Sequence, residues 1–244
     1  MLHEQGTRGV AGCRTVVDEL VGEDFSDAGL AGQTLRGRRF DGCLFVDADL
    51  RDLHTIGCVF TRCDFTLADL ARSSHRGTAF RSCTFRGSTL TNAVLDGCSL
   101  LGSTLTECRL RPITLTSTDL TLVGLGGADL RKATLVGLRL VEANLTEADL
   151  TGADLRDADL RGARMLATRL RNADLRGALL DADALVQAQL HGAKVDIDTA
   201  VAFAAAHGLL VDLPSPWSPE VSTPVAGSRN PGRHSRRSCD DGVP

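Results

Sequence analysis

The sequence predicts an all-β fold, a four-sided solenoid of parallel β-strands, on the basis of three observations. Large apolar residues recur at every fifth position, and phenylalanines recur at twenty-residue intervals. Aromatic residues, these phenylalanines included, make up only 4% of the 244 residues, and there is no tyrosine. A core with so few rings must be filled by small and aliphatic side chains in a repetitive way. Fixed periods of this kind indicate stacked repeat units.

The five-residue period defines the unit. From Leu20 to Val195 every fifth residue falls in one register of 36 positions, of which 25 are leucine and seven are phenylalanine, with Met165 a further apolar member. Only Thr55 and His75 are polar. Steps of five would spread leucines around a helix and would alternate the faces of a strand. Each unit is therefore expected to be a short extended piece and a corner, with the large residue and the residue two before it pointing inward.

The phenylalanines give the number of sides. They occur in adjacent pairs that repeat every twenty residues, and Thr55 and His75 are also twenty apart. The pairs are Phe40/Phe45, Phe60/Phe65 and Phe80/Phe85. Like residues stack on like if one coil contains four units, so the sequence predicts a square cross-section and about nine coils. Thr55 and His75 should then meet inside the core.

Residues 20–195 resemble the pentapeptide-repeat family, whose unit reads Ala-(Asp/Asn)-Leu-x-x; residues 148–152, ADLTG, show this unit plainly. The resemblance implies a right-handed quadrilateral β-helix. Residues 53–55, 75–85, 108–112, 192–196 and 200–209 are more narrowly similar to the fluoroquinolone-resistance members of the family. Those members are dimeric mimics of B-form DNA that bind DNA gyrase, and the resemblance implies the same function here.

The ends of the chain depart from the repeat. Residues 1–19 are expected to be an N-terminal extension and 213–244, with six of the seven prolines, a disordered tail. Within 196–212, Asp196 or Asp198 can cap a helix from about 199 to 207 that stops at Gly208. This helix could cover the open end of the solenoid or join two chains, and the two roles are compatible. The expected dimer contacts are Val201, Phe203, Ala204, Leu209 and Leu210.

The cysteines are predicted to be core residues. Six of the eight occupy the small inward position, where a thiol acts as a small apolar side chain. The six are Cys43, Cys58, Cys63, Cys83, Cys98 and Cys108. Their spacing follows the repeat and matches no metal-ligand pattern. With no phosphate-binding loop and no catalytic cluster either, we expect no enzyme, metal or cofactor, and a cytoplasmic protein without signal peptide or membrane span.

Charge is unevenly distributed over the predicted sides. The side containing Phe25, Phe45 and Phe65 carries Asp24, Asp27, Asp47, Asp64, Glu107 and Glu147 against Arg86 and Arg164, a net of −4, and the next side is net +3. Aspartates before leucine can simply support turns. Alternatively, a dimer joined at its C-terminal ends would present a continuous acidic surface. Its expected residues are Glu142, Glu147, Asp149, Asp154, Asp157, Asp159, Asp174, Asp181 and Asp183.

The function that the resemblance implies is binding of DNA gyrase, without direct binding of nucleic acid. A scaffold that binds another protein through its flat sides is the alternative. Binding through DNA mimicry should weaken as the salt concentration rises, whereas binding through an apolar contact should barely change.

Overall fold

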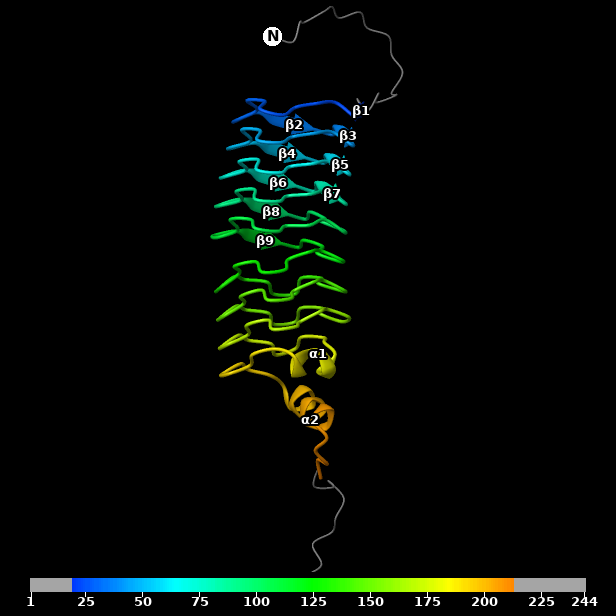
Figure 1. The fold of residues 1–244 in the computed structure, drawn as a ribbon, viewed down its shortest axis with the longest axis vertical. Helices are drawn as coiled ribbons and strands as arrows, with labels where there is room; N and C mark the ends of the chain where they lie inside the picture. Colours follow the sequence, from blue (N-terminus) through cyan, green and yellow to red (C-terminus); the bar gives the residue numbers. More distant parts are fainter. Residues whose placement is uncertain (1–18, 213–244) are drawn as a thin grey trace, which may run out of the picture. The chain divides into compact units, whose positions relative to one another are not determined.

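The twenty-residue period of the sequence is also the period of the backbone in the computed structural model, which describes residues 19–212 (Figure 1). Leu20 pairs in parallel with Phe40, Phe40 with Phe60, and Phe60 with Phe80. The predictions for residues 1–18 and 213–244, including those for Cys13 and Cys239, lie outside the described residues. The protein is a parallel β-solenoid, as the repeat predicts.

Within residues 19–212, nine three-residue strands form two parallel sheets on adjacent sides of the solenoid. One sheet has the order β1-β3-β5-β7 and the other the order β2-β4-β6-β8-β9. The strands are β1 Glu19–Val21, β2 Thr34–Arg36, β3 Arg39–Asp41, β4 His54–Ile56, β5 Val59–Thr61, β6 Ser74–Arg76, β7 Ala79–Arg81, β8 Val94–Asp96 and β9 Thr114–Thr116. We name the four sides by their first central residues, the Leu20, Phe25, Leu30 and Leu35 sides, and each side repeats every twenty residues.

The sequence predicts about nine coils, whereas regular strands occupy only about five. Beyond β9 the coils are joined by isolated parallel bridges, the last of which pairs Asp174 with Lys194. The difference lies in the corners. From Leu120 to Ala178, each corner is closed by a hydrogen bond such as that from the Val123 N–H to the Leu120 carbonyl. This bond shortens the extended piece to one bridging residue, whereas the strands lie where the corner lacks it.

The core consists of stacked columns of the inward residues. Phe45, Phe65 and Phe85 stack with ring centroids 4.9 and 4.8 Å apart, and Phe60 and Phe80 lie edge-on to them. Leucines continue these columns toward the C-terminus and are almost fully buried. Thr55 and His75 meet in the core as predicted, with the Thr55 hydroxyl 2.7 Å from His75 Nδ1.

The cysteines occupy the predicted inward position. Five are buried and Cys108 is partly buried, and all six are free thiols. Cys63 and Cys83 donate hydrogen bonds to the carbonyls of Phe40 and Phe60. Burial raises the pKa of Cys98, and it raises the pKa of Cys108 to about 11.

Two helices end the described unit. α1 (Ala182–Val186) replaces an extended piece of the repeat and buries Leu185, and the sequence analysis did not predict it. α2 (Ile197–Ala206) begins after Asp196, near the predicted start, and is followed by Gly208 at φ +77°. The Asp196 side chain does not cap α2; its carboxylate accepts the Gly177 N–H instead. Phe203 packs against the solenoid core, so α2 covers this end.

Candidate partner-binding surface

Where an aspartate precedes the central leucine or phenylalanine of a side, it supports the corner. Its carboxylate accepts the N–H of the residue two positions later, as Asp64 does from Thr66 at 2.9 Å and Asp149 does from Thr151 at 3.0 Å. This Asx turn satisfies an N–H group that would otherwise face solvent. The turn-supporting role considered from the sequence is therefore present in the structure.

Many of these aspartates also bind an arginine. When arginine stands two residues after the aspartate, its Nε and Nη2 hold both carboxylate oxygens, at 2.8 and 2.7 Å in the Asp154–Arg156 pair. The hydrogen bonds from Arg156 hold the pKa of Asp154 below its usual value. The Asp159–Arg161 and Asp174–Arg176 pairs repeat this arrangement, and the latter lowers the pKa of Asp174 to about 2. These carboxylates are ionised, but the charge of each is balanced by the arginine that it binds.

The nine acidic residues expected to form one surface are spread over all four sides of the solenoid. Asp154, Asp159 and Asp174 are paired with arginine, Asp149 lies 3.7 Å from Arg169, and Asp181 accepts the Gly162 N–H. Within residues 19–212, the side chains of the remaining four make no hydrogen bond or ion pair. They are Glu142, Glu147, Asp157 and Asp183.

A denser group of carboxylates lies at the other end of the solenoid. Five of them line three successive coils of the Phe25 side and form no ion pair with any described residue. We call these residues the N-terminal acidic patch: Glu23, Asp24, Asp27, Asp47 and Asp64. Asp27 and Asp47 project from corners with φ of +56° and +54°. The side was recognisable as acidic in the sequence, but the predicted site followed the expected dimer end.

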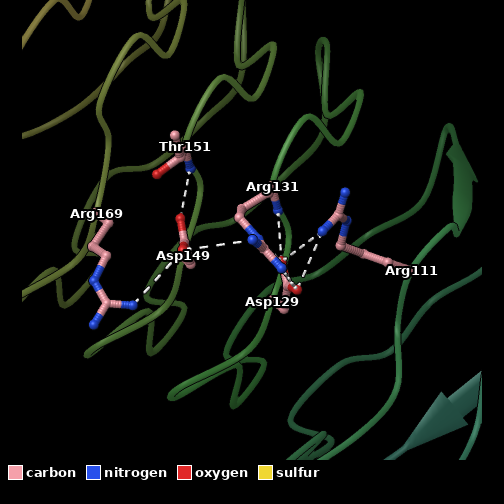
Figure 2. Close-up of polar contacts among 6 residues, drawn as sticks. All are labelled: Arg111, Asp129, Arg131, Asp149, Thr151 and Arg169. Carbon is pink, nitrogen blue, oxygen red and sulfur yellow. Dashed lines mark hydrogen bonds and ion pairs between the residues drawn. The ribbon is translucent and has the colours of Figure 1, made fainter.

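The Leu30 side is basic where the Phe25 side is acidic. Arg111, Asp129, Arg131, Asp149 and Arg169 alternate along it (Figure 2). Asp129 accepts Arg131 Nε at 2.8 Å and Arg111 Nη1 at 3.3 Å, and these hydrogen bonds, chiefly that from Arg131, lower its pKa. Burial would raise the pKa of Asp149. The hydrogen bonds from Thr151 and the charges of Arg169 and Arg131 outweigh it, so that pKa is lowered.

The residues predicted for the dimer interface have two different surroundings. Val201, Phe203 and Ala204 are half-buried, and the Phe203 ring lies 4.2 Å from that of His207. Leu209 and Leu210 are 61% and 101% exposed. Ile197, at the start of α2, is 77% exposed and was not among the predicted contacts. An apolar surface is thus open to a partner at this end.

Among residues 19–212 there is no group of three His, Cys, Asp or Glu side chains that could hold a metal ion. No helix in the same range is long and apolar enough to cross a membrane.

The repeat, the stacked coils and the outward carboxylates define a repeat solenoid with charged outer sides. A family model described as "Pentapeptide repeats" matches residues 43–74, 76–111, 125–162 and 139–177. The chain belongs to the pentapeptide-repeat family.

Two relatives share part of the sequence. The pentapeptide repeat protein MfpA of Mycobacterium tuberculosis is 53% identical over 55 residues, which cover 22% of this chain and 30% of that protein. MfpA of Mycolicibacterium smegmatis is 53% identical over 51 residues, covering 21% and 27%. The chain thus matches less than a third of the length of these relatives.

Solved structures share the fold more completely. QnrB1, described as a plasmid-mediated fluoroquinolone resistance protein, superposes with a TM-score of 0.69 at 23% identity in its full-length form. The match covers 78% of this chain and 97% of QnrB1. A trypsin-treated form also gives a TM-score of 0.69, with 22% identity, covering 80% and 98%. At this level of identity the likeness concerns the fold.

Proposed function

We propose that this protein binds DNA gyrase by imitating DNA and thereby lowers fluoroquinolone susceptibility. The observation that carries the proposal is a ladder of outward carboxylates without ion pairs, presented at coil spacing in a chain similar to MfpA. The contact would be made by surface complementarity alone, without catalysis, in the cytoplasm.

The physical basis of the proposal is electrostatic. Duplex DNA presents a phosphate about every 3.4 Å along each strand. Carboxylates on successive coils, about 4.8 Å apart, produce a similar field without matching each phosphate. A cationic surface evolved for DNA would attract such a rod from a distance and orient it.

The effective carboxylates are those that arginine does not neutralise. They form two groups, the N-terminal acidic patch and the C-terminal set Glu142, Glu147, Asp157 and Asp183. Joining two chains through Ile197, Leu209 and Leu210 would bring two C-terminal sets together and leave an acidic patch at each far end.

The test is a supercoiling assay with purified gyrase, titrating the protein with and without ciprofloxacin. The native protein should inhibit supercoiling or reduce drug-induced cleavage. Two variants, each of which removes two negative charges, serve as controls for each other. Asp27→Asn/Asp47→Asn removes charge from the N-terminal acidic patch, and Glu147→Gln/Asp157→Asn removes it from the C-terminal set. The variant that loses the effect identifies the contact. If neither variant differs from the native protein, mimicry by these carboxylates is wrong.

A scaffold role is the second candidate. Leu101 and Leu122, which are 37% and 52% exposed on neighbouring coils of the Leu20 side, favour it. Apolar residues that are adjacent on a flat side could contact a protein of another kind. In that case Leu122→Ser would weaken partner binding while the two charge variants would not.

A further inference from the structure

The ladder between coils is interrupted on two adjacent sides. Elsewhere a residue bridges to the residue twenty positions later: Thr89 pairs with Arg109, and Asp129 pairs with Asp149. Arg109 and Asp129 do not pair, although both belong to the described residues. On the Leu35 side, β9 is the last strand of its sheet, and Thr114 does not bridge to Thr134. The stack therefore opens between the coil that contains β9 and the next coil.

Pro112 accounts for the opening. It occupies a corner at which the same side otherwise has a residue with positive φ, such as Arg72 and Lys132, both at +58°. The N–H of such a residue donates to the coil that follows, as Lys132 does to the Thr151 carbonyl. Proline has no N–H, and its ring excludes a positive φ. The bond that would tie this corner to the Arg131 carbonyl cannot form.

The opening is a slot of about 420 Å³. One wall is residues 111–116 and the other is residues 131–134. Figure 1 shows the coils spread apart below β9. Ile113, Leu115 and Ala133, at inward positions of the repeat, are only partly buried here and give the slot an apolar floor.

The backbone of both walls has unused hydrogen-bonding groups. In intact coils the central residue donates to the next coil, as Leu135 does to Asp154, and the residue before it donates back, as Asp154 does to Ala133. Neither the Leu115 N–H nor the Thr134 N–H has such a bond among the described residues. The Ile113 and Thr134 carbonyls lack the corresponding donors. The slot thus presents donors and acceptors in the order of a parallel ladder from which one strand is missing.

Cations surround the mouth of the slot. Arg111 reaches across it to Asp129 on the following coil, and Arg131 binds the same carboxylate (Figure 2). Lys132 lines the slot and forms no ion pair with any residue in the range 19–212. Two of these three cations share the Asp129 carboxylate and Lys132 has no carboxylate partner, which leaves a net positive mouth over an apolar floor.

We propose that this slot binds an extended acidic peptide segment of a protein partner, which lies parallel to β9 and completes the ladder. Strand addition to an open sheet edge draws its affinity from main-chain hydrogen bonds and its specificity from alternate side chains. Here the inward side chains would contact Ile113 and Leu115, and the outward carboxylates would meet Lys132 and Arg111. A nucleic-acid backbone is a poorer fit, since its phosphates only accept hydrogen bonds and would leave the Ile113 and Thr134 carbonyls unpaired. The inference does not depend on gyrase binding.

The probe is the blocked peptide acetyl-VEVEV-amide, added to the full-length protein. Amide exchange of Leu115 and Thr134, followed by NMR, should slow by at least about tenfold at saturation, because both N–H groups gain partners. The Leu95 amide, already paired within the sheet, is the internal control and should not change. Unchanged exchange at Leu115 and Thr134 with millimolar peptide would overturn the proposal.

Two further comparisons separate strand addition from simple charge attraction. A peptide of the same sequence with alternate backbone nitrogens methylated keeps its carboxylates but loses donors, and it should not bind. In the protein, Arg111→Gln/Lys132→Gln should weaken binding about tenfold, whereas Arg164→Gln/Arg171→Gln removes equal charge elsewhere and should leave it unchanged. Equal binding of the methylated peptide, or equal weakening by both variants, would show that the slot adds no strand.

Discussion

At the residue scale, His75 is the clearest departure from the repeat. It lies in the leucine column, and its ring is held by hydroxyls on both nitrogens, Thr55 at Nδ1 and Ser73 at Nε2, 2.7 and 2.9 Å away. The Thr55 hydroxyl also contacts that of Thr78 at 2.8 Å. Every polar atom of the ring is satisfied, so the neutral imidazole fits this position in the core. Burial, with a smaller contribution from the charge of His54, lowers the pKa of His75 to about 4.

This burial predicts a specific pH dependence of stability. Between pH 6.5 and about 4, the unfolded chain binds a proton at His75 that the folded chain does not. The free energy of unfolding should therefore fall as the pH drops through this window, by up to about 3 kcal/mol, and recover fully near pH 7. Urea unfolding at pH 7, 6, 5 and 4.5 measures the change.

The control is Thr55→Leu/His75→Leu, which restores the leucine column on two coils. The Ser73 and Thr78 hydroxyls lose a contact in this variant, but they do not titrate, so the readout is the slope of stability with pH and not the absolute stability. The variant should lose most of the pH dependence above pH 4.5. If it retained the native slope, other groups would be responsible.

At the scale of the element, the phenylalanine columns are the most sensitive part of the core. Phe65 is 1% exposed and lies between Phe45 and Phe85, with Phe60 and Phe80 edge-on. Phe65→Ala should lower the free energy of unfolding by about 3–5 kcal/mol, through lost burial and the cavity left behind. Phe65→Leu should cost much less, because leucine fills the same column farther along. Chemical denaturation of the three proteins makes the comparison, and an alanine cost below 1 kcal/mol would mean that the stack relaxes around the gap.

How much the sequence reveals depends on whether a feature repeats. The columns, the four sides and the Thr55–His75 contact follow from periods of five and twenty, because stacking brings residues twenty apart into contact. Single departures are harder to predict. Pro112 preserves the register in the sequence yet opens the ladder, and α1 forms where Leu185 still fits the column. The feature that could have indicated the opening is a proline at a corner position where the equivalent residues of other coils have a positive φ.

The candidate site was less predictable than the fold. Sequence places each carboxylate on a side, but it does not say which arginine folds back on it. Asp154 and Asp157 are three residues apart, and only the first has an arginine at hydrogen-bonding distance. Charge counted from the sequence therefore overstates the acidity of the C-terminal coils, where arginines neutralise several carboxylates, and it does not reveal that the carboxylates of the N-terminal acidic patch lack ion pairs.

At the scale of the whole molecule, the exposed apolar residues beside α2 predict self-association. Leu209→Glu/Leu210→Glu should shift the protein to monomer in sedimentation velocity at micromolar concentration, since charge at an apolar contact is costly to bury. Leu67→Glu, which alters an equally open leucine far from α2, is the matched control and should not change the association state. A monomeric native protein would contradict the predicted dimer.

Salt dependence separates the two proposed kinds of partner contact. Charges across an exposed interface are screened over about 10 Å at 0.1 M salt, so mimicry of DNA should lose affinity for gyrase by about tenfold or more between 50 and 300 mM NaCl. Asp27→Asn/Asp47→Asn or Glu147→Gln/Asp157→Asn should flatten that dependence, according to which carboxylates make the contact. A scaffold contact through Leu101 and Leu122 should instead hold its affinity across the range and weaken in Leu122→Ser. Surface binding measured at four salt concentrations with these three variants assigns the contact to carboxylates at one end of the solenoid or to its apolar side.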